Sequence, residues 1–333
     1  MISSNQKRLI TIVAPACNEA AVIKIFYEKL IEVMENNSGG YDWEIIFVDD
    51  GSTDNTLEIL KELRQKDQKI KWISFSRNFG QQSALTAGLE YAKGDAVITM
   101  DCDLQHPASL IPEMITQWEA GFDLVLTVRE DDDTIGLTKK FTSTWFYRLI
   151  NALSNIPIKP SAVDFRLMSR KAVNGFLRFG EMHRFIRGMV SWMGYRTCEL
   201  SYKPQSRPSG RSKYTPKKMI NFAIDGLTSF SIIPLRVSTI LGFLIFLGAL
   251  SYALYAIIVW FIKPQSLQVG WTSLLVTINL LGGAILLFIG IIGEYIGRIY
   301  EQVKMRPLYL IDEMDGFDEE SGCRSEFRDG KKT

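Results

Sequence analysis

The sequence contains few of the residues from which metal clusters and disulfide frameworks are built. Its 333 residues include four widely spaced cysteines, none of them in a CxxC pair, and only two histidines. A zinc cluster and a disulfide-stapled fold are therefore disfavoured, and a reducing, cytosolic environment fits best. We interpret His106 and His183 as ordinary polar residues.

Glycine-rich phosphate-binding fingerprints are also missing. Neither a GxGxxG nor a GxxxxGK pattern follows the first strand-like run, LITIVAP, which argues against a nicotinamide enzyme and against an NTPase. The net charge of +1 points to no particular partner. We expect no nucleic acid among the partners, and a homo-oligomer is left open.

Charged residues are missing from two long stretches in the C-terminal third. Val237 to Ile262 spans 26 residues without a charge and Pro264 to Gly293 another 30, with only Lys263 between them. At a helical rise of 1.5 Å per residue, either stretch can cross about 30 Å of hydrocarbon. We predict a two-helix transmembrane hairpin, with helices over about 237–262 and 270–296. The alternative is two buried helices of a soluble core, which seldom run so long uncharged.

Basic residues flank the predicted hairpin on both sides. They are Lys217, Lys218, Arg236, Arg298, Lys304 and Arg306. The positive-inside rule places both flanks in the cytoplasm. We therefore expect a multi-pass protein of the cytoplasmic (inner) membrane whose N-terminal domain and both termini are cytoplasmic.

The chain is expected to have four parts. An N-terminal domain over residues 1–214 precedes a segment over 215–235, in which apolar residues recur at helical spacing. We interpret this segment as an amphipathic helix on the membrane surface; the alternative is a helix packed on the soluble domain. The hairpin occupies 236–300, and the tail over 301–333 is expected to be partly disordered, because its sequence after Leu310 is polar and aperiodic.

The first 130 residues alternate apolar strand-like runs with helical patterns. The runs are LITIVAP, WEIIFVDD, KWISFS, DAVITMD and DLVLTV. Repeated strand-helix-strand units of about 25 to 35 residues indicate an α/β fold with a mainly parallel, Rossmann-like sheet and right-handed crossovers. Ligands of such sheets gather at the carboxyl ends of the strands.

Unusual polar residues follow the first four of these runs. They are Asn18 and Glu19, Asp49 and Asp50, Arg77 and Asn78, and lastly Asp101, Asp103 and Gln105. Their shared position predicts one site at the carboxyl edge of the sheet. We expect this site to be rich in carboxylates and poor in nearby basic residues.

The stretch ITMDCDLQHP is the most unusual of these clusters, because Asp101 and Asp103 flank a single cysteine. Carboxylates this close repel each other unless a cation lies between them. Such oxygen ligands suit Mg2+ or Mn2+, which would also bridge the phosphate oxygens of a bound nucleotide. The alternative is a solvated turn, and for Asp49 and Asp50 it is a helix N-cap.

Six stretches carry a family resemblance. They are PACNEA, VDDGSTD, SRNFGQQSAL, MDCDLQHP, VDFRLMSR and RPSGRSKY. In this order, and followed by the predicted hairpin, they resemble the family 2 glycosyltransferases with the GT-A fold. More narrowly they are similar to the polyprenyl-phosphate glycosyltransferases, which include bactoprenol glucosyltransferases and dolichyl-phosphate mannosyltransferases. The resemblance covers about residues 8–305. Arg211 departs from it, since a smaller or neutral residue is expected there, and the QxxRW sequence of polymerising synthases is missing.

The resemblance implies roles for individual residues. The nucleotide would be lined by Pro15, Asn18, Glu19, Asp49, Asp50 and Asp101, with Asp50 near the base. Mg2+ or Mn2+ would be held against the donor diphosphate by Asp101, Asp103 and Gln105. The sugar and acceptor would meet Asp164 and Arg166, which with Asp103 make up the catalytic set.

Two basic residues ahead of the predicted surface helix complete the implied site. Arg207 and Lys213 would grip the donor diphosphate or a lipid phosphate. The alternative is simple attraction to anionic headgroups.

The resemblance thus implies a membrane-anchored hexosyltransferase. It would move one sugar, glucose from UDP-glucose being favoured, from a nucleotide diphosphate sugar to undecaprenyl phosphate with inversion. Mannose, N-acetylhexosamine and aminoarabinose are alternative sugars. One rival is a processive polysaccharide synthase, for which two spans leave little material for a conduit. The other is a non-enzymatic membrane scaffold that only binds nucleotide.

Overall fold

The computed structural model describes residues 7–36, 40–129, 162–203, 233–262 and 270–318. These residues fall into two compact units. The first contains the described residues up to 203 together with 307–318, and the second contains 233–262 and 270–306. Arg207, Lys213 and the greater part of the predicted surface helix lie outside the described residues.

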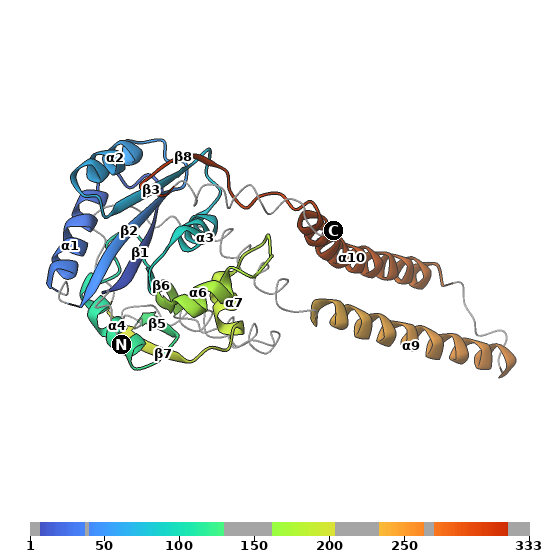
Figure 1. The fold of residues 1–333 in the computed structure, drawn as a ribbon. Coiled ribbons are helices and arrows are strands. Elements are labelled where there is room, and N and C mark those ends of the chain that lie inside the picture. Colours follow the sequence, from blue (N-terminus) through green and yellow to red (C-terminus); the bar gives the residue numbers. More distant parts are fainter. Residues whose placement is uncertain (1–6, 37–39, 130–161, 204–232, 263–269, 319–333) are drawn as a thin grey trace, which may run out of the picture. The chain divides into compact units, whose positions relative to one another are not determined.

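An eight-stranded sheet forms the centre of the first unit (Figure 1). Its strands are β1 (Arg8–Ala16), β2 (Tyr41–Asp49), β3 (Ile70–Phe75), β4 (Ala96–Thr99), β5 (Leu124–Arg129), β6 (Ala162–Ser169), β7 (Thr197–Tyr202) and β8 (Ile311–Asp315). They lie in the order β7-β5-β6-β4-β1-β2-β3-β8. Pairs β1-β2, β1-β4, β2-β3 and β5-β7 are parallel, while β6 and β8 run antiparallel to their neighbours. The predicted α/β fold with a mainly parallel sheet is confirmed.

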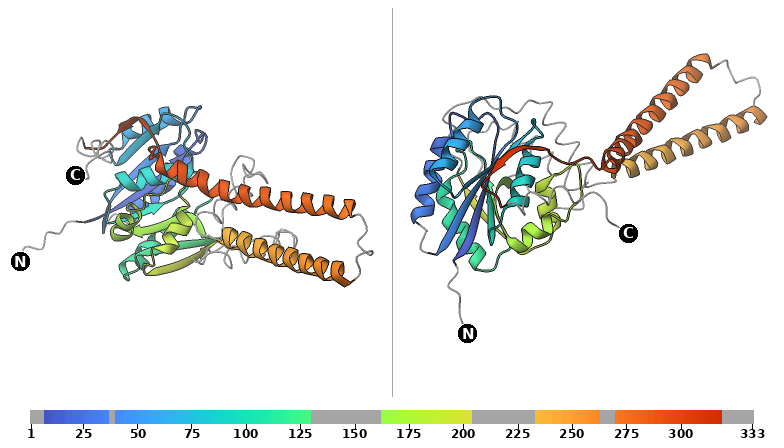
Figure 2. Two further views of the ribbon diagram at one scale, coloured as in Figure 1. Left: turned by 90° about the vertical axis from the view of Figure 1, so that its right-hand side faces the viewer. Right: turned by 45° about the horizontal axis from the view of Figure 1, so that its top comes forward.

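Helices cover both faces of this sheet (Figures 1 and 2). They are α1 (Ile23–Asn36), α2 (Thr56–Lys66), α3 (Gln81–Tyr91), the short η1 (Ala108–Leu110), α4 (Ile111–Glu119), α6 (Arg170–Phe176) and α7 (Ile186–Trp192). α1, α2 and α4 pack into one apolar core with alternate residues of β1 and β2. α3, α6 and α7 lie on the opposite face (Figure 1).

The central strands are apolar because the sheet is covered on both faces. Residues Ile10 to Ala14 of β1 are all buried, and so are Trp43 to Asp49 of β2. Strands buried on both sides lose the alternation of apolar and polar residues and read as continuous apolar runs. α3 packs closely on β1, since a Cβ atom at Gly88 would lie 2.1 Å from Cγ1 of Val13. The sheet is therefore a rigid base for the loops at its carboxyl edge.

The second unit consists of two long apolar helices, α9 (Ile233–Ile262) and α10 (Trp271–Val303). Leu235–Tyr252 and Thr277–Val303 are apolar enough to cross a membrane, and neither window is buried inside the structure. The alternative of two helices inside a soluble core is therefore wrong. α9 covers the predicted stretch 237–262, and α10 covers 270–296 except for Gly270, runs on to Val303 and pairs Glu294 with Arg298 near its polar end.

The prediction of a tail without structure after Leu310 is wrong for residues 311–315. These residues form β8, which pairs antiparallel with β3 and completes one edge of the sheet. The sequence does not predict this strand, because its two half-buried residues, Ile311 and Met314, are three positions apart instead of two. The cause is a shift in the pairing register between Ser74 and Phe75 of β3. A search for alternate apolar residues fails on such a bulge.

Candidate active site

The loops that follow β1 and β2 are tied together by Asn18. Its backbone N–H donates to Oγ of Ser52 at 2.9 Å, and its side-chain oxygen accepts from the N–H of Thr53 at 2.8 Å. Asn18 has a φ of 57°, a left-handed conformation that asparagine tolerates better than most residues. Glu19 lies beside it and donates its N–H to Oγ1 of Thr56, so both predicted residues stand at the carboxyl edge.

Asp49 and Asp50 at the end of β2 organise neighbouring loops and do not cap a helix. Asp49 accepts from Oγ of Ser74 at 3.0 Å and from the N–H of Ser52 at 3.3 Å. Asp50 accepts from the backbone N–H groups of Phe79, at 2.6 Å, and Gly80. Both carboxylates are buried. Because α2 begins only at Thr56, the N-cap alternative is wrong for both residues.

Gly51 lets the loop after β2 pass directly against the loop after β3. Its φ is 63°, and a Cβ atom there would lie 2.4 Å from the carbonyl carbon of Arg77 and 2.6 Å from the backbone N of Asn78. Only glycine fits this approach without moving the backbone. The loops that carry Asp50 and Phe79 are therefore held in one fixed arrangement.

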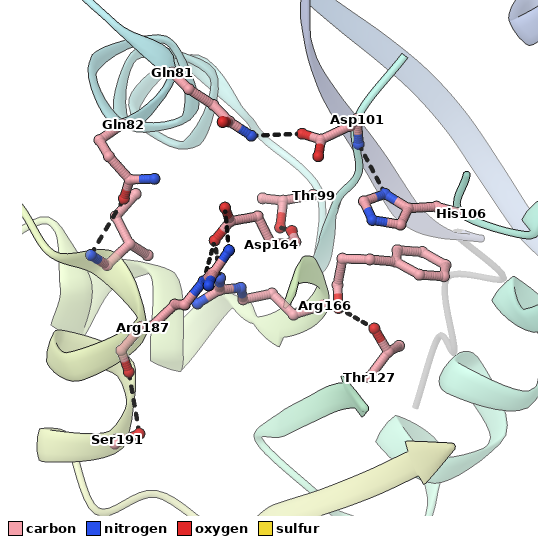
Figure 3. Close-up of polar contacts among 12 residues, drawn as sticks. Gln81, Gln82, Thr99, Asp101, His106, Thr127, Asp164, Arg166, Arg187 and Ser191 are labelled. Atoms are coloured by element: carbon pink, nitrogen blue, oxygen red, sulfur yellow. Dashed lines mark hydrogen bonds and ion pairs between the residues drawn. The ribbon is translucent and has the colours of Figure 1, made fainter. Parts of the chain in front are cut away.

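Asp101 and Asp103 lie just beyond β4 at the same edge. Asp101 accepts from Nε2 of Gln81 at 2.7 Å, while its own N–H donates to Nδ1 of His106 at 3.1 Å (Figure 3). Asp103 accepts from the N–H of Gln105 at 3.1 Å. His106, which the sequence indicates only as an ordinary polar residue, is buried, stacks on Phe165 and accepts the backbone N–H of Asp101. Burial lowers the pKa of His106 to about 4, which keeps the ring neutral.

Asp164 reaches the same site from the antiparallel strand β6. Thr99 of β4 is paired with Arg166 of β6, and continuing this register brings Asp164 level with Asp101. Asp164 and Arg166 share one face of the strand, as their two-residue spacing predicts, and the structure shows them joined in a buried ion pair. Phe165 and Leu167 point to the other face and join the apolar core.

Arg187 is a further candidate for the site, and the sequence alone does not indicate it. It stands in the first turn of α7 and directs Nε and Nη2 to the two oxygens of Asp164, at 3.4 and 3.3 Å (Figure 3). The side chain of Arg187 is 24% exposed, whereas that of Arg166 is 3% exposed. The expectation of a site poor in basic residues is therefore wrong, because α7 and β6 each contribute a guanidinium.

The start of α3 connects these groups. Gln81 reaches Asp101, and the neighbouring Gln82 accepts the backbone N–H of Ile186 at 3.2 Å (Figure 3). One pair of glutamines therefore places α7, and with it Arg187, beside the carboxylates. The sequence shows the two adjacent glutamines in SRNFGQQSAL, but it does not indicate which residues they contact.

Asp101 and Asp164 differ in acidity. Burial, reinforced by Asp164 and Asp103, raises the pKa of Asp101 to about 7, although Arg187 and Gln81 oppose the shift. Burial alone would also raise the pKa of Asp164, but Arg187 and Arg166 outweigh it and hold that pKa below its usual value. Asp164 is thus a poor base, and Asp101 lacks a sufficient cationic partner.

The carboxylates fit a divalent cation that is shared with a substrate. Among the described residues, no three His, Cys, Asp or Glu side chains converge as a ready metal cage. Mg2+ commonly takes one or two protein carboxylates and completes its shell with phosphate oxygens and water. Burial is the largest cause of the raised pKa of Asp101, and the negative charges of Asp164 and Asp103 add to it; a divalent ion would relieve this repulsion between carboxylates.

A pH dependence of stability follows from Asp101. Its folded-state pKa of about 7 exceeds the ordinary value of 3.8, so the metal-free folded chain binds more protons than the unfolded chain between these values. We therefore expect stability to fall as the pH rises from about 4 to about 7. Thermal unfolding across this range should show the fall in the wild type and a flatter profile in Asp101→Asn. Identical profiles would contradict the assignment.

The fold and the site together define a GT-A-like transferase, with a mixed, mostly parallel sheet and a carboxylate-lined carboxyl edge. The family is given by a match over residues 11–176 to "Glycosyl transferase family 2". The chain belongs to this family and is a glycosyltransferase, so the resemblance read from the six stretches is confirmed.

Several relatives match almost the whole chain. An uncharacterized glycosyltransferase, YkcC, of Bacillus subtilis is 42% identical over 92% of this chain and 94% of its own. The SfII prophage-derived bactoprenol glucosyl transferase of Shigella flexneri is 43% identical over 91% and 97%. The prophage bactoprenol glucosyl transferase homolog of Escherichia coli is 42% identical over 91% and 98%. A solved mannosyltransferase of Pyrobaculum calidifontis, bound to GDP-Man and Mn2+, covers 62% of this chain and 59% of its own at 18% identity, with a TM-score of 0.43.

Proposed function

We propose that this protein transfers one sugar from a nucleotide diphosphate sugar to a polyprenyl phosphate. The observation that carries the proposal is the meeting of Asp101, Asp164 and Arg187 at the carboxyl edge of a family 2 fold in a chain with two apolar helices. Relatives named bactoprenol glucosyl transferases support UDP-glucose as donor and undecaprenyl phosphate as acceptor.

The donor is expected to bind across the ends of β1 to β4. Pro15, Asn18, Glu19, Asp49 and Asp50 would face the nucleotide, and Asp101, Asp103 and Gln105 would hold Mg2+ or Mn2+ against the diphosphate. When bound, this ion neutralises the charge that develops on the leaving diphosphate. Arg207 and Lys213 are proposed to supply positive charge that binds either the donor diphosphate or the phosphate of the lipid acceptor.

The acceptor needs no general base. A phosphate monoester with a second pKa of about 6 already carries an anionic oxygen at pH 7. That oxygen attacks the anomeric carbon opposite the diphosphate, the new C–O bond forms, and the nucleoside diphosphate leaves with the electron pair. The anomeric configuration is thereby inverted. Asp164 is proposed to orient, because Arg166 and Arg187 hold its pKa low.

Arg187 is better placed than Arg166 to meet a phosphate. The guanidinium of Arg166 is buried against Asp164, while Arg187 keeps about a quarter of its side chain exposed. A planar guanidinium can bind a carboxylate and a phosphate oxygen at once. We propose that Arg166 fixes Asp164 and that Arg187 contacts the acceptor phosphate or the donor.

The membrane location follows from the acceptor. A polyprenyl phosphate keeps its headgroup at the bilayer surface, and the apolar helices α9 and α10 would anchor the enzyme there. We propose the cytoplasmic membrane, with the catalytic unit and both termini on the cytoplasmic side, where nucleotide sugars are made.

A panel of radiolabelled nucleotide sugars tests the proposal and identifies the sugar. Purified full-length protein with undecaprenyl phosphate and Mn2+ should transfer label from one donor, with UDP-glucose favoured over donors of mannose, N-acetylhexosamine or aminoarabinose. More than one sugar per lipid would instead support the processive synthase. Nucleotide binding without transfer from any donor would support the scaffold.

A further inference from the structure

The chain returns from the second helix to the first unit through a segment that we call the C-terminal strap, residues 307–318. It lies along the edge of the sheet as β8, and the N–H of Ser76 donates to the carbonyl of Leu310 at 3.1 Å. Ion pairs in which the carboxylate is more than half exposed join Glu313 to Lys61 and Asp315 to Arg64. Since solvent screens such pairs, the strap is held mainly by its strand pairing and its aromatic side chains.

Tyr309 makes the central aromatic contact of the strap. Its ring stacks on Phe75, the last residue of β3, with centroids 4.9 Å apart and planes at 15°. Its hydroxyl donates to Oε2 of Glu90, near the end of α3, at 2.8 Å. Burial raises the pKa of this hydroxyl, so it keeps its proton and remains a donor.

The contact continues from Phe75 into the donor loop, which we define as residues 76–80. Phe75 meets Phe79 edge to face, with centroids 5.7 Å apart. The N–H groups of Phe79 and Gly80 are the ones that Asp50 accepts. α3 begins immediately after this loop with Gln81, the partner of Asp101.

Tyr309 therefore touches the framework of the candidate site at two places. One is the aromatic pair that supports the donor loop, and the other is the far end of the helix that begins with Gln81. We propose that Tyr309 is a positioning residue, which holds the donor loop against Asp50 and so sets the affinity for the nucleotide sugar. This rests on the proposed function, because the loop matters to affinity only if the donor binds there.

The test begins without any donor. In full-length protein, Tyr309→Ala should speed hydrogen exchange at the backbone amides of Phe79 and Gly80 by about tenfold, since both the ring contact and the hydroxyl bond are lost. The donor KM should rise by a similar factor with little change in kcat. Tyr309→Phe keeps the stacked ring and should restore most of the exchange protection and of the KM.

Phe317 supplies a matched control. It also lies in the C-terminal strap, but its ring meets Tyr91 edge to face, with centroids 5.2 Å apart, and lies under the ammonium of Lys71, and both partners are outside the donor loop. Phe317→Ala should leave exchange at Phe79 and Gly80 and the donor KM near wild type. Equal effects from Phe317→Ala, or no effect from Tyr309→Ala, would overturn the proposal.

Two further results separate this proposal from the proposed function. Tyr309→Leu, which keeps apolar bulk but removes the ring, serves where the alanine variant does not fold, and it should give the same loss of protection. If that loss occurs while wild-type protein binds no nucleotide sugar, loop positioning stands and the assigned donor is wrong. If a Tyr309 variant shows faster hydrogen exchange in the donor loop but binds the donor as tightly as wild type, Tyr309 does not set the donor affinity and the proposal is overturned.

Discussion

Asp103→Ala should remove nearly all turnover, by a factor of at least about 100, while the chain still folds. The residue is partly buried, lies beyond the end of β4 and supports the turn through the N–H of Gln105. Losing that bond costs little stability, whereas under the proposed mechanism losing this carboxylate would weaken binding of the divalent ion and leave the leaving diphosphate unneutralised. Initial rates of sugar transfer and a thermal unfolding curve measure the two effects separately.

A neighbouring substitution and a chelator serve as controls. Cys102 is buried between the two aspartates with its side chain in the apolar core, so Cys102→Ala should retain activity. EDTA should abolish sugar transfer by the wild type, and added Mn2+ should restore the transfer. Full activity in EDTA would show that sugar transfer needs no divalent ion.

Asp164→Asn should be the most destabilising single change at the site. It leaves the buried guanidinium of Arg166 and the partly exposed one of Arg187 without their carboxylate. Removing one partner of a buried ion pair costs about 3 to 5 kcal/mol. Urea unfolding of both variants should show a larger loss for Asp164→Asn than for Arg187→Gln, because Arg187 still reaches water.

The pH dependence of this pair has a defined sign. The folded-state pKa of Asp164 lies below its ordinary value, so its contribution to stability is present above that value and is lost as the pH falls through the lowered pKa. Asp164→Asn should remove this acid-side loss. A wild type and a variant with the same loss of stability in acid would contradict the assignment.

Turnover separates orientation from proton transfer at Asp164. If it only orients, Asp164→Asn slows the reaction but keeps an acidic limb near pH 6, set by the acceptor phosphate. The comparison is the pH-rate profile of wild type and variant at saturating donor. A limb that vanishes in the variant would make Asp164 the base.

The sequence alone predicts those features of the site that depend on the order of residues within one strand and the turn after it. Apolar runs ending in Asn18, Asp50 and Asp101 predict a common edge, because parallel strands of one sheet end on the same side. The two-residue spacing of Asp164 and Arg166 likewise predicts a shared face of a strand. These predictions need no knowledge of which strand lies beside which.

Features set by strand neighbours and distant helices could not be predicted in this way. β6 enters the sheet between β4 and β5 and runs antiparallel, which brings Asp164 level with Asp101. Arg187 comes from a seven-residue helix without a distinctive pattern, positioned through Gln82. β8 pairs across a bulge, so its apolar residues lack the spacing of a regular strand.

The proposed function requires the transfer of one sugar to a lipid phosphate, and this reaction can be measured directly. Purified full-length protein should be incubated with UDP-glucose, undecaprenyl phosphate and Mn2+, and the lipid products weighed by mass spectrometry. We predict a single lipid product heavier by one hexose, with an inverted anomeric centre by NMR, and no such product with Asp103→Ala. A lipid carrying several sugars, a retained configuration, or unchanged lipid with every nucleotide sugar tried would contradict it.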